Sequence, residues 1–182
     1  MLLAACAELG PGDGRMAIDL GCGHGTEAVE LLAHGWSVTA VDTSEAGLAL
    51  LRTRIPASAR HQIRVVCASF IEVSLPRAHL IQASYSLPFC PPQGFPVLWA
   101  RIREALIPGG IFAGQLFGTR DSWAGDPTMT FHARHEVDVL LDGLQILRLD
   151  ETEQDGSAFS GPKHWHTFGV LARKPLRSPR PG

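Results

Sequence analysis

The sequence lacks a surplus of charge of either sign, and charged residues make up only 19% of its 182 residues. Its net charge of −2 provides no basic excess that would favour nucleic acid or an anionic membrane surface. No apolar run approaches the roughly 20 residues that a membrane-spanning helix needs, and the first residues lack the charged and apolar regions of a signal peptide. The sequence therefore predicts a cytoplasmic protein that binds neither nucleic acid nor membranes.

Cysteine is scarce and scattered. The four cysteines lie far apart and form no C-x-x-C pair, which excludes a disulfide framework or a zinc signature. Three histidines in the second half of the chain, His132, His164 and His166, raise the alternative of a metal site. No acid or cysteine stands at metal-ligand spacing beside them, so no metal is expected.

The sequence does contain a regular alternation of short β-type runs and helical stretches, with 45% hydrophobic residues. This alternation predicts a single α/β domain over residues 1–174, with a mostly parallel sheet and helices on both of its faces. Seven strands are expected, at 16–20, 37–41, 62–67, 80–84, 111–117, 144–151 and 165–173. Helices are expected at 2–9, 27–34, 96–106 and 133–142, with a further one capped by Thr43 or Ser44 and ended by Pro56. Residues 175–182 are expected to form a disordered tail.

The last two β-type runs have no helix between them, so they should form a hairpin whose final strand is antiparallel. Ligands of parallel α/β sheets bind at the carboxyl ends of the strands, where an antiparallel strand begins. Residues 163–166 are therefore expected on the ligand side of the sheet. The acidic run 150–155 is expected at the solvated end of the hairpin.

One short stretch carries the strongest functional signal, Asp19-Leu20-Gly21-Cys22-Gly23-His24-Gly25-Thr26. It connects a predicted strand to a predicted helix through glycines, which bring bare backbone and a helix N-terminus close to a ligand. The next predicted strand ends in Asp42, whose carboxylate can accept both hydroxyls of a ribose. This order of elements indicates a site for a nucleoside cofactor.

The spacing of the glycines distinguishes two cofactors. Dinucleotide sites use G-x-G-x-x-G, but the sixth position counted from Gly21 is Thr26, and the third glycine comes one residue early. Asp19, just ahead of the turn, would repel a pyrophosphate and would stabilise an ammonium group. S-adenosylmethionine carries such an ammonium and no phosphate, so it is favoured over NAD.

Three segments together resemble the class I S-adenosylmethionine-dependent methyltransferases: AIDLGCGHGTEAVELL at 17–32, AVD at 40–42, and LIPGGIF at 106–112. The resemblance covers roughly residues 15–173, and the small tellurite-resistance-type and thiopurine-type enzymes are similar in size. It implies a Rossmann-like fold and methyl transfer from S-adenosylmethionine. The residues that it assigns to the cofactor are Asp19, Gly21, Cys22, Gly23, Gly25, Asp42, Thr43, Ala68, Ser69, Phe70 and Ser84. Among them Ser69 departs from the family, since many members have an acid there that accepts the adenine amino group.

The acceptor side is less specified. Candidate substrate contacts are Tyr85 after the fourth strand, Trp123 in the loop 118–132, His132 and Trp165. His164 or His166 would be the base for a hydroxyl acceptor, and Tyr85 could orient the substrate, whereas a thiolate or another soft anion needs no base. The segment 84–89 only partly resembles the N-P-P-Y/F motif of nucleic-acid methyltransferases, which disfavours base methylation.

The leading hypothesis is therefore a methyltransferase that acts on the oxygen, sulfur or nitrogen of a small molecule by in-line transfer. Two alternatives remain: a partner subunit that binds S-adenosylmethionine without activity of its own, and an NAD-dependent enzyme. Only about nine residues precede Gly10, which predicts an unusually open pocket or one that a second protomer completes in a homodimer.

Overall fold

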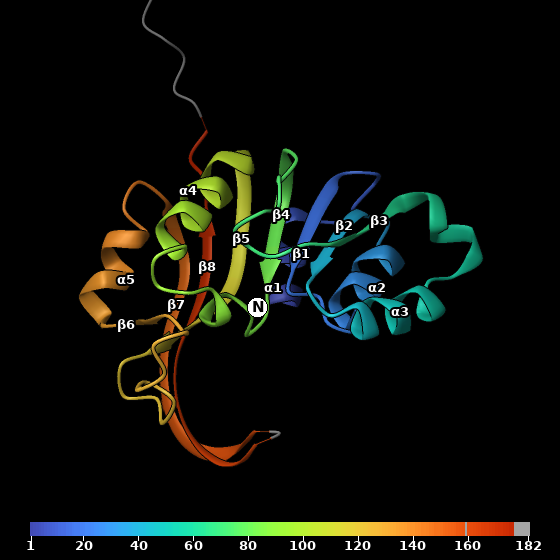
Figure 1. The fold of residues 1–182 in the computed structure, drawn as a ribbon. Coiled ribbons are helices and arrows are strands. Elements are labelled where there is room, and N and C mark those ends of the chain that lie inside the picture. Colours follow the sequence, from blue (N-terminus) through green and yellow to red (C-terminus); the bar gives the residue numbers. More distant parts are fainter. Residues whose placement is uncertain (159, 177–182) are drawn as a thin grey trace, which may run out of the picture.

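The computed structural model describes residues 1–158 and 160–176, and one eight-stranded sheet forms its centre (Figure 1). Seven strands follow the order β3-β2-β1-β4-β5-β8-β7, and the short β6 pairs with β5 beside this path. Strands β1 to β6 pair in parallel, and β8 is antiparallel to both β5 and β7. The strands are β1 (Met16–Leu20), β2 (Ser37–Asp42), β3 (Ile63–Cys67), β4 (Ala78–Ala83), β5 (Leu106–Gly118), β6 (Phe131–His132), β7 (Gln145–Ala158) and β8 (Gly161–Arg173).

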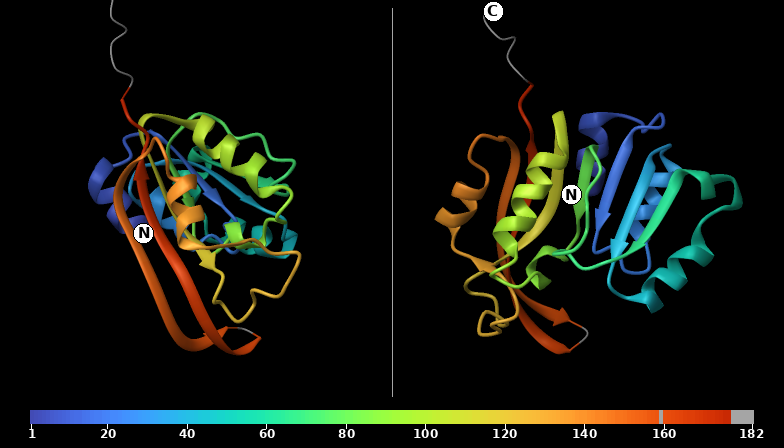
Figure 2. Two further views of the ribbon diagram at one scale, coloured as in Figure 1. Left: turned by 90° about the vertical axis from the view of Figure 1, so that its left-hand side faces the viewer. Right: turned by 45° about the horizontal axis from the view of Figure 1, so that its top comes forward.

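Helices cover both faces of this sheet, as the turned view in Figure 2 shows. The central strands are apolar on both sides, which is typical of a parallel sheet between two layers of helices. Ile18 and Ile81 belong to the core under α4 (Phe95–Ala105) and α5 (Arg134–Leu140). Ala17 and Leu80, one residue away on each strand, belong to the core under the other helices. Those helices are α1 (Leu2–Leu9), α2 (Thr26–Ala33) and α3 (Glu45–Arg54).

Local sequence signals set the helix boundaries on either side of β2. Gly35 has a φ of +78° after α2, which ends the helix in a conformation that glycine adopts without strain. The Ser44 hydroxyl accepts a hydrogen bond from the Gly47 N–H at 3.1 Å and caps α3. Two short 3₁₀ helices, η1 (Ala57–Gln62) and η2 (Leu87–Phe89), complete the connections.

The structure confirms the seven predicted strands, most to within two residues, and the antiparallel final strand. It corrects three details. Strand β5 begins at Leu106 rather than at residue 111, and Gly109 within it has a positive φ of +79°, which glycine adopts without strain. The short β6 lies in the segment predicted as a loop, so the sheet has eight strands.

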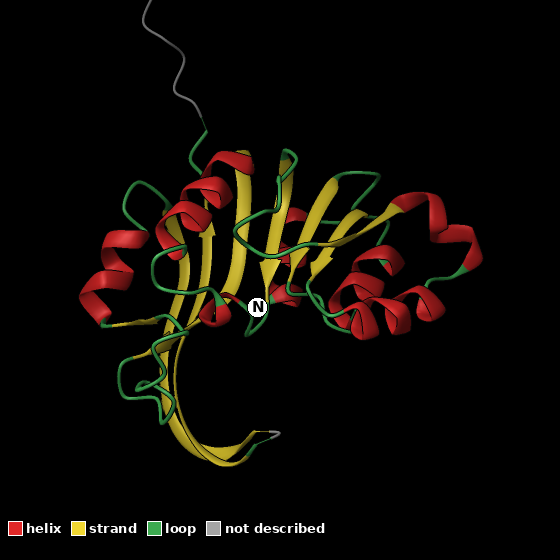
Figure 3. Ribbon diagram, viewed as in Figure 1, coloured by secondary structure: helices red, strands yellow, loops and turns green. Residues whose placement is uncertain are grey.

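The third correction concerns the hairpin. Strand β7 pairs with β8 along its whole length, from Gln145 opposite Arg173 to Ala158 opposite Gly161. The acidic run 150–155 therefore lies inside β7 and not at the hairpin end. Figures 1 and 3 show this hairpin continuing past the carboxyl ends of the parallel strands and curving beneath them. The predicted tail, 175–182, lies outside the described residues except for its first two. No helix of the described part is long and apolar enough to cross a membrane.

Candidate active site

A cavity of about 730 Å³ lies where the carboxyl ends of β1, β2, β3 and β4 meet. Each of these strands delivers one segment of its wall, because parallel strands end at the same edge of a sheet. The residues that line the cavity are Gly21, Gly23, Asp42, Thr43, Ser44, Ala68, Phe70, Ser84, Tyr85, Ser86 and Phe89.

The glycine loop between β1 and α2 forms one wall. Gly23 has a φ of +53°, and a Cβ placed there would meet nothing within 4 Å, so its backbone faces open space on the cavity side. Gly25 serves packing instead: a Cβ would come within 2.2 Å of Leu51 on α3. The loop therefore combines an exposed backbone with a tight fit against the helix behind it.

Asp42 at the end of β2 joins this loop to the start of α3. Its Oδ2 accepts the Gly23 N–H and its Oδ1 accepts the Ser44 N–H, both at 2.8 Å. A carboxylate has about four acceptor positions, so each oxygen retains one for a ligand hydroxyl. The carboxylate is thus fixed by the backbone and still able to bind a ribose.

Asp19 lies at the end of β1, 1% exposed, beneath the same loop. Burial, together with the nearby charges of Glu27 and Asp42, raises the pKa of its carboxyl from 3.8 to about 8, against a hydrogen bond from the Ala28 backbone that lowers it. Its Oδ2 is buried without a hydrogen-bond partner. A buried, unsatisfied acceptor that ionises with difficulty would gain from a cationic ligand group.

The segment after β3 lines the opposite side of the cavity. Ala68 and Phe70 line it, and the Phe70 ring comes within 3.5 Å of where a Cβ of Gly21 would lie. Ser69 does not line it, because its hydroxyl donates a hydrogen bond of 2.7 Å to the Glu72 carboxylate. This side of the cavity is therefore apolar, which suits the flat face of an adenine. The Ser69 hydroxyl points to Glu72 instead.

Tyr85 marks the boundary between the cofactor cavity and the space beside it. Its φ of +50° is unusual for a residue with a side chain, and its N–H donates to the Gln115 side chain at 3.2 Å. The ring is 48% exposed and meets the edge of Trp165 at a centroid distance of 5.8 Å. The backbone strain thus presents this ring at the mouth of the cavity.

Two smaller pockets adjoin this mouth. One, of about 310 Å³, lies between Tyr85 and the hairpin and is lined also by Gln154, Trp165 and Thr167. The other, of about 450 Å³, lies beside Phe89, which also lines the cofactor cavity, and is lined mainly by residues of the loop after β5. Its lining residues are Phe89, Ser122, Trp123, Gly125, Asp126, Met129 and Ser160. The structure therefore brings the predicted residues Tyr85, Trp123 and Trp165 to these two pockets beside the cavity.

The two histidines predicted as bases lie on the other face of β8. His164 places Nδ1 at 2.6 Å from Asp155 and Nε2 at 3.1 Å from Glu153, and these carboxylates raise its pKa. His166 is 1% exposed; its Nδ1 accepts the Arg120 N–H at 3.1 Å and its Nε2 lies 3.0 Å from Glu151. Their ring nitrogens are engaged in the hairpin, which argues against either histidine as the base.

His132 is the predicted substrate contact that the structure leaves apart. It is 7% exposed, its ring lies 4.7 Å from the ring of Phe95 on α4, and it lines none of the three pockets. Burial lowers its pKa. These contacts indicate a packing role under α4.

Of the eleven predicted cofactor residues, the seven that line the cavity are Gly21, Gly23, Asp42, Thr43, Ala68, Phe70 and Ser84. Cys22 and Gly25 are buried in the loop, and Asp19 lies beneath it. Sequence reasoning missed Ser44, Ser86 and Phe89 as lining residues. The Ser86 hydroxyl donates to the Leu20 carbonyl, which brings the segment after β4 against Gly21, a contact that spans 66 residues.

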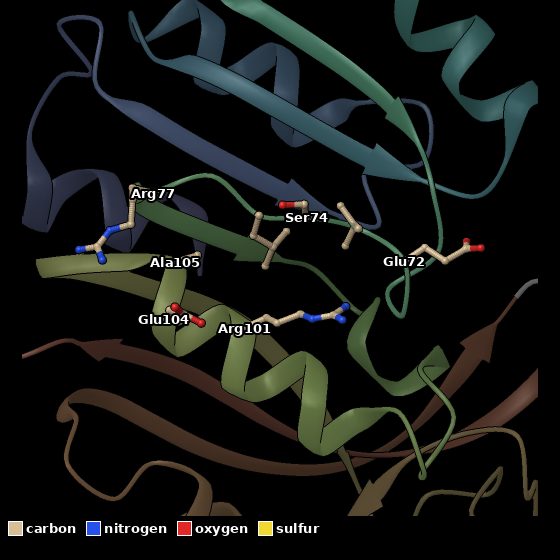
Figure 4. Close-up of a pocket in the computed structure, with 8 residues that line it drawn as sticks. Glu72, Ser74, Arg77, Arg101, Glu104 and Ala105 are labelled. Carbon is tan, nitrogen blue, oxygen red and sulfur yellow. The ribbon is translucent and has the colours of Figure 1, made fainter.

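A separate hollow of about 380 Å³ lies between the segment after β3 and α4, and it shares no lining residue with the cofactor cavity (Figure 4). Arg77 and Arg101 line it together with Glu72 and Glu104, so its charges balance. Arg101 also donates to the Ile71 carbonyl, which supports the loop. The hollow adds no group to the site described above.

Comparison with known proteins agrees with this geometry. A family model described as a methyltransferase domain matches residues 17–110. Carboxy-S-adenosyl-L-methionine synthase of Dichelobacter nodosus is 34% identical over 105 residues, which cover 54% of this chain and 43% of that protein. The chain thus spans less than half the length of this curated relative.

Solved structures share the fold. TehB from Haemophilus influenzae superposes with a TM-score of 0.78 at 17% identity, over 95% of this chain and 61% of that one. Magnesium protoporphyrin IX methyltransferase from Synechocystis, solved with bound S-adenosylmethionine, gives a TM-score of 0.70 at 15% identity, over 95% and 76% of the two chains. Both likenesses extend over nearly all of this chain.

Proposed function

The chain belongs to the methyltransferase domain family and uses S-adenosylmethionine, and from this premise we propose that it transfers the methyl group to a small-molecule acceptor. One observation carries the proposal: the cofactor cavity shares Tyr85 with a pocket of about 310 Å³ and Phe89 with a pocket of about 450 Å³. Pockets of this size suit a small molecule better than a macromolecule.

The residues of the cavity fit the cofactor. The glycine loop offers backbone beside open space, the Asp42 carboxylate retains free acceptor positions, and Ala68 with Phe70 provides an apolar wall. The unsatisfied Oδ2 of Asp19 suits the ammonium of the methionine end, whereas a pyrophosphate would offer this acceptor no donor. These features favour S-adenosylmethionine over NAD.

The chain contributes alignment and exclusion of water to the transfer. S-adenosylmethionine supplies an electrophilic methyl group when bound. Asp42 would hold the ribose and the glycine loop would line the methionine end, while Tyr85, Phe89 and Trp165 border the acceptor side with aromatic rings. Proximity and a dry pocket suffice for a displacement that disperses charge.

The acceptor side contains few titratable groups. Among the described residues that line the three pockets, the acids are Asp42 and Asp126, and there is no histidine, lysine or arginine. A nucleophile that arrives already ionised, or that loses its proton to water, therefore fits better than a hydroxyl that needs a base. A carboxylated acceptor or product, as the name of the curated relative implies for that protein, would find no cationic partner there.

The proposal also keeps the expected cytoplasmic setting, which the four free thiols among the described residues support. A homodimer that closes the open side of the acceptor pockets remains part of the proposal. Sedimentation of the purified protein with and without cofactor would test it.

The decisive experiment measures formation of S-adenosylhomocysteine. Purified protein would be incubated with S-adenosylmethionine and matched panels of thiols, phenols, amines and soft inorganic anions, with cofactor binding followed separately by calorimetry. Turnover of at least one small molecule is expected. Tight cofactor binding without turnover of any of them would support the alternative of a cofactor-binding subunit, and binding of NADH alone would overturn the proposal.

A further inference from the structure

A buried lysine lies behind the acceptor side of the site. The ammonium of Lys163, in the extended part of β8, pairs with the Asp121 carboxylate, and both side chains are 0% exposed. A buried charge is costly unless its partners are placed around it. The surroundings of this buried pair must therefore offset the cost of removing both charges from water.

Three aromatic rings surround this ammonium. The Lys163 Nζ lies 3.8 Å from the ring centroid of Trp123, 4.5 Å from that of Trp165, and 5.2 Å from that of Phe117. All three lie within the roughly 6 Å over which a ring attracts a cation. We refer to Asp121, Phe117, Trp123 and Trp165 as the lysine box.

The rings also contact one another, and Asp121 ties the box together. Trp123 and Trp165 lie 5.9 Å apart, and Phe117 lies 5.7 Å from Trp165 in an edge arrangement. The Asp121 carboxylate accepts hydrogen bonds from the backbone N–H of Trp123 at 3.0 Å and from the backbone N–H of His166 at 3.2 Å. One ion pair thus joins the loop after β5 to the hairpin.

Opposite Lys163 and Trp165, the other strand leaves room for the indole. Gly156 pairs with Lys163 across the hairpin, and a Cβ at Gly156 would lie 3.3 Å from the Trp165 ring. Lys163 and Trp165 share a face of β8 because they are two residues apart. The hairpin is therefore shaped to place this lysine and this indole side by side.

The walls of the box are also walls of the acceptor pockets. Trp165 meets Tyr85 and lines the pocket of about 310 Å³. Trp123 lies 6.3 Å from Phe89 and lines the pocket of about 450 Å³. The Lys163 ammonium therefore contacts both Trp123, which lines one pocket, and Trp165, which lines the other.

We propose that Lys163 is a positioning residue that holds Trp123 and Trp165 as the two walls of the acceptor side. The assignment rests on the proposed function, since it takes the space beside Tyr85 as the acceptor side. The box is a built ammonium site that the chain fills with its own side chain. Removing the charge frees the indoles and leaves the cofactor cavity intact, because no residue of the box lines that cavity.

The test compares Lys163→Met, which keeps the length and apolar bulk of the side chain, with Lys163→Ala, which empties the box. Lys174→Met is the matched control, since Lys174 lies beyond the opposite end of β8 and donates to the carbonyls of Arg103 and Leu106. Tryptophan fluorescence and near-ultraviolet circular dichroism report the indoles, and calorimetry with S-adenosylhomocysteine reports the cofactor cavity. Ethylammonium, added to Lys163→Ala, reports the empty site.

The expected result is an altered tryptophan spectrum in both Lys163 variants, with cofactor affinity within about twofold of the unmodified protein. Ethylammonium should restore the spectrum and thermal stability of Lys163→Ala in a saturable way, and should leave Lys174→Met unchanged. With an acceptor in hand, Lys163→Met should raise its KM about tenfold, a change of the size that one or two cation–π contacts give.

An unchanged spectrum in Lys163→Met, together with no response of Lys163→Ala to ethylammonium, would overturn the proposal. If Lys163→Ala does not fold, the Lys163→Met spectrum and cofactor affinity decide alone. A loss of cofactor affinity well beyond about twofold in Lys163→Met would also overturn the proposal, because the effect would then not be confined to the indoles. Failure of the unmodified protein to bind S-adenosylmethionine would instead overturn the proposed function and leave the box untouched.

Discussion

At the scale of single residues, Asp42 combines two tasks in one carboxylate. Its oxygens hold the Gly23 and Ser44 N–H groups and keep acceptor positions toward the cavity. Replacing Asp42 by alanine should weaken S-adenosylhomocysteine binding by about 1–3 kcal/mol, because charge-assisted hydrogen bonds are lost. Calorimetry measures this loss. Glu45→Ala, which removes an exposed acid three residues away, should leave the affinity nearly unchanged, and an unchanged affinity in Asp42→Ala would place the ribose elsewhere.

Asp19 leads to a prediction about protons. With a pKa of about 8 its carboxyl is mostly protonated at pH 7, and a cationic group bound beside it would favour the ionised form. Binding of S-adenosylmethionine at pH 7 should therefore release up to about one proton. Titration calorimetry in two buffers of different ionisation enthalpy measures the release, which should vanish near pH 9. Asp19→Asn should bind without it, and equal release from both proteins would contradict the assignment.

The same carboxyl affects stability with a defined sign. The folded-state pKa is raised above the ordinary value of 3.8, so the unfolded chain gives up this proton first as pH rises. Stability from this group is present below pH 4 and is lost as pH rises toward about 8. Asp19→Asn should remove this slope.

Ser69 shows where single-residue reasoning reached its limit. Its position after β3 matched the family, and its hydroxyl was chemically suited to an adenine amino group. The structure turns that hydroxyl to Glu72, three residues on, and gives the wall to Ala68 and Phe70. The position of Ser69 after β3 is predictable from the sequence, but its hydrogen bond to Glu72 is not.

At the scale of elements, the β7–β8 hairpin depends on charges from distant segments. Arg120 bridges Glu151 and Glu153 at 3.0 and 2.8 Å, and His164 bridges Glu153 and Asp155. From the sequence, the acidic run 150–155 looked like a solvated turn because its partners were out of view. Arg120 lies 31 and 33 residues before its glutamates, and the two histidines face them from the next strand.

The hairpin should accordingly respond to pH. The carboxylates of Asp155 and Glu153 raise the pKa of His164. The contribution of His164 to the stability of the hairpin is therefore present below pH 6.5 and is lost as pH rises through the folded-state pKa. Hydrogen bonds lower the pKa values of Glu151 and Glu153, so their contribution is present above pH 4.5 and is lost as pH falls further. The protection factors of the hairpin amides, in which the intrinsic pH dependence of exchange is divided out, should be highest between these limits.

The matched variant for this prediction is His164→Gln, which keeps a hydrogen-bonding side chain without the titration. It should abolish the fall in protection above pH 6.5 and keep the fall in protection at acid pH. A hairpin whose exchange follows the same pH course in both proteins would show that His164 does not contribute.

At the scale of the whole molecule, the sequence predicted the two halves of the site unequally. The cofactor half is local: a glycine loop, the residue that ends β2, and the segment after β3 each carry a short motif, and parallel strands bring them together. The proposed acceptor half is built from long-range contacts among Tyr85, Trp123, Trp165 and Lys163. Those residues can be placed on this side of the sheet from strand direction alone, but the lysine box and the pairing of His164 and His166 with the acids of β7 require the register of β7 with β8.

The cofactor assignment makes a prediction for the stability of the folded chain. A ligand that binds only the folded state stabilises it by about 2.7 kcal/mol at 100 times its Kd. For a chain of this length that corresponds to a rise in Tm of about 5–11 °C. S-adenosylmethionine and S-adenosylhomocysteine should both produce such a rise in a thermal-shift measurement, with a smaller one for Asp42→Ala at the same concentration. NADH should produce none, because the glycine loop departs from the G-x-G-x-x-G spacing that holds a pyrophosphate; protection by NADH and not by S-adenosylhomocysteine would reverse the assignment of the cavity.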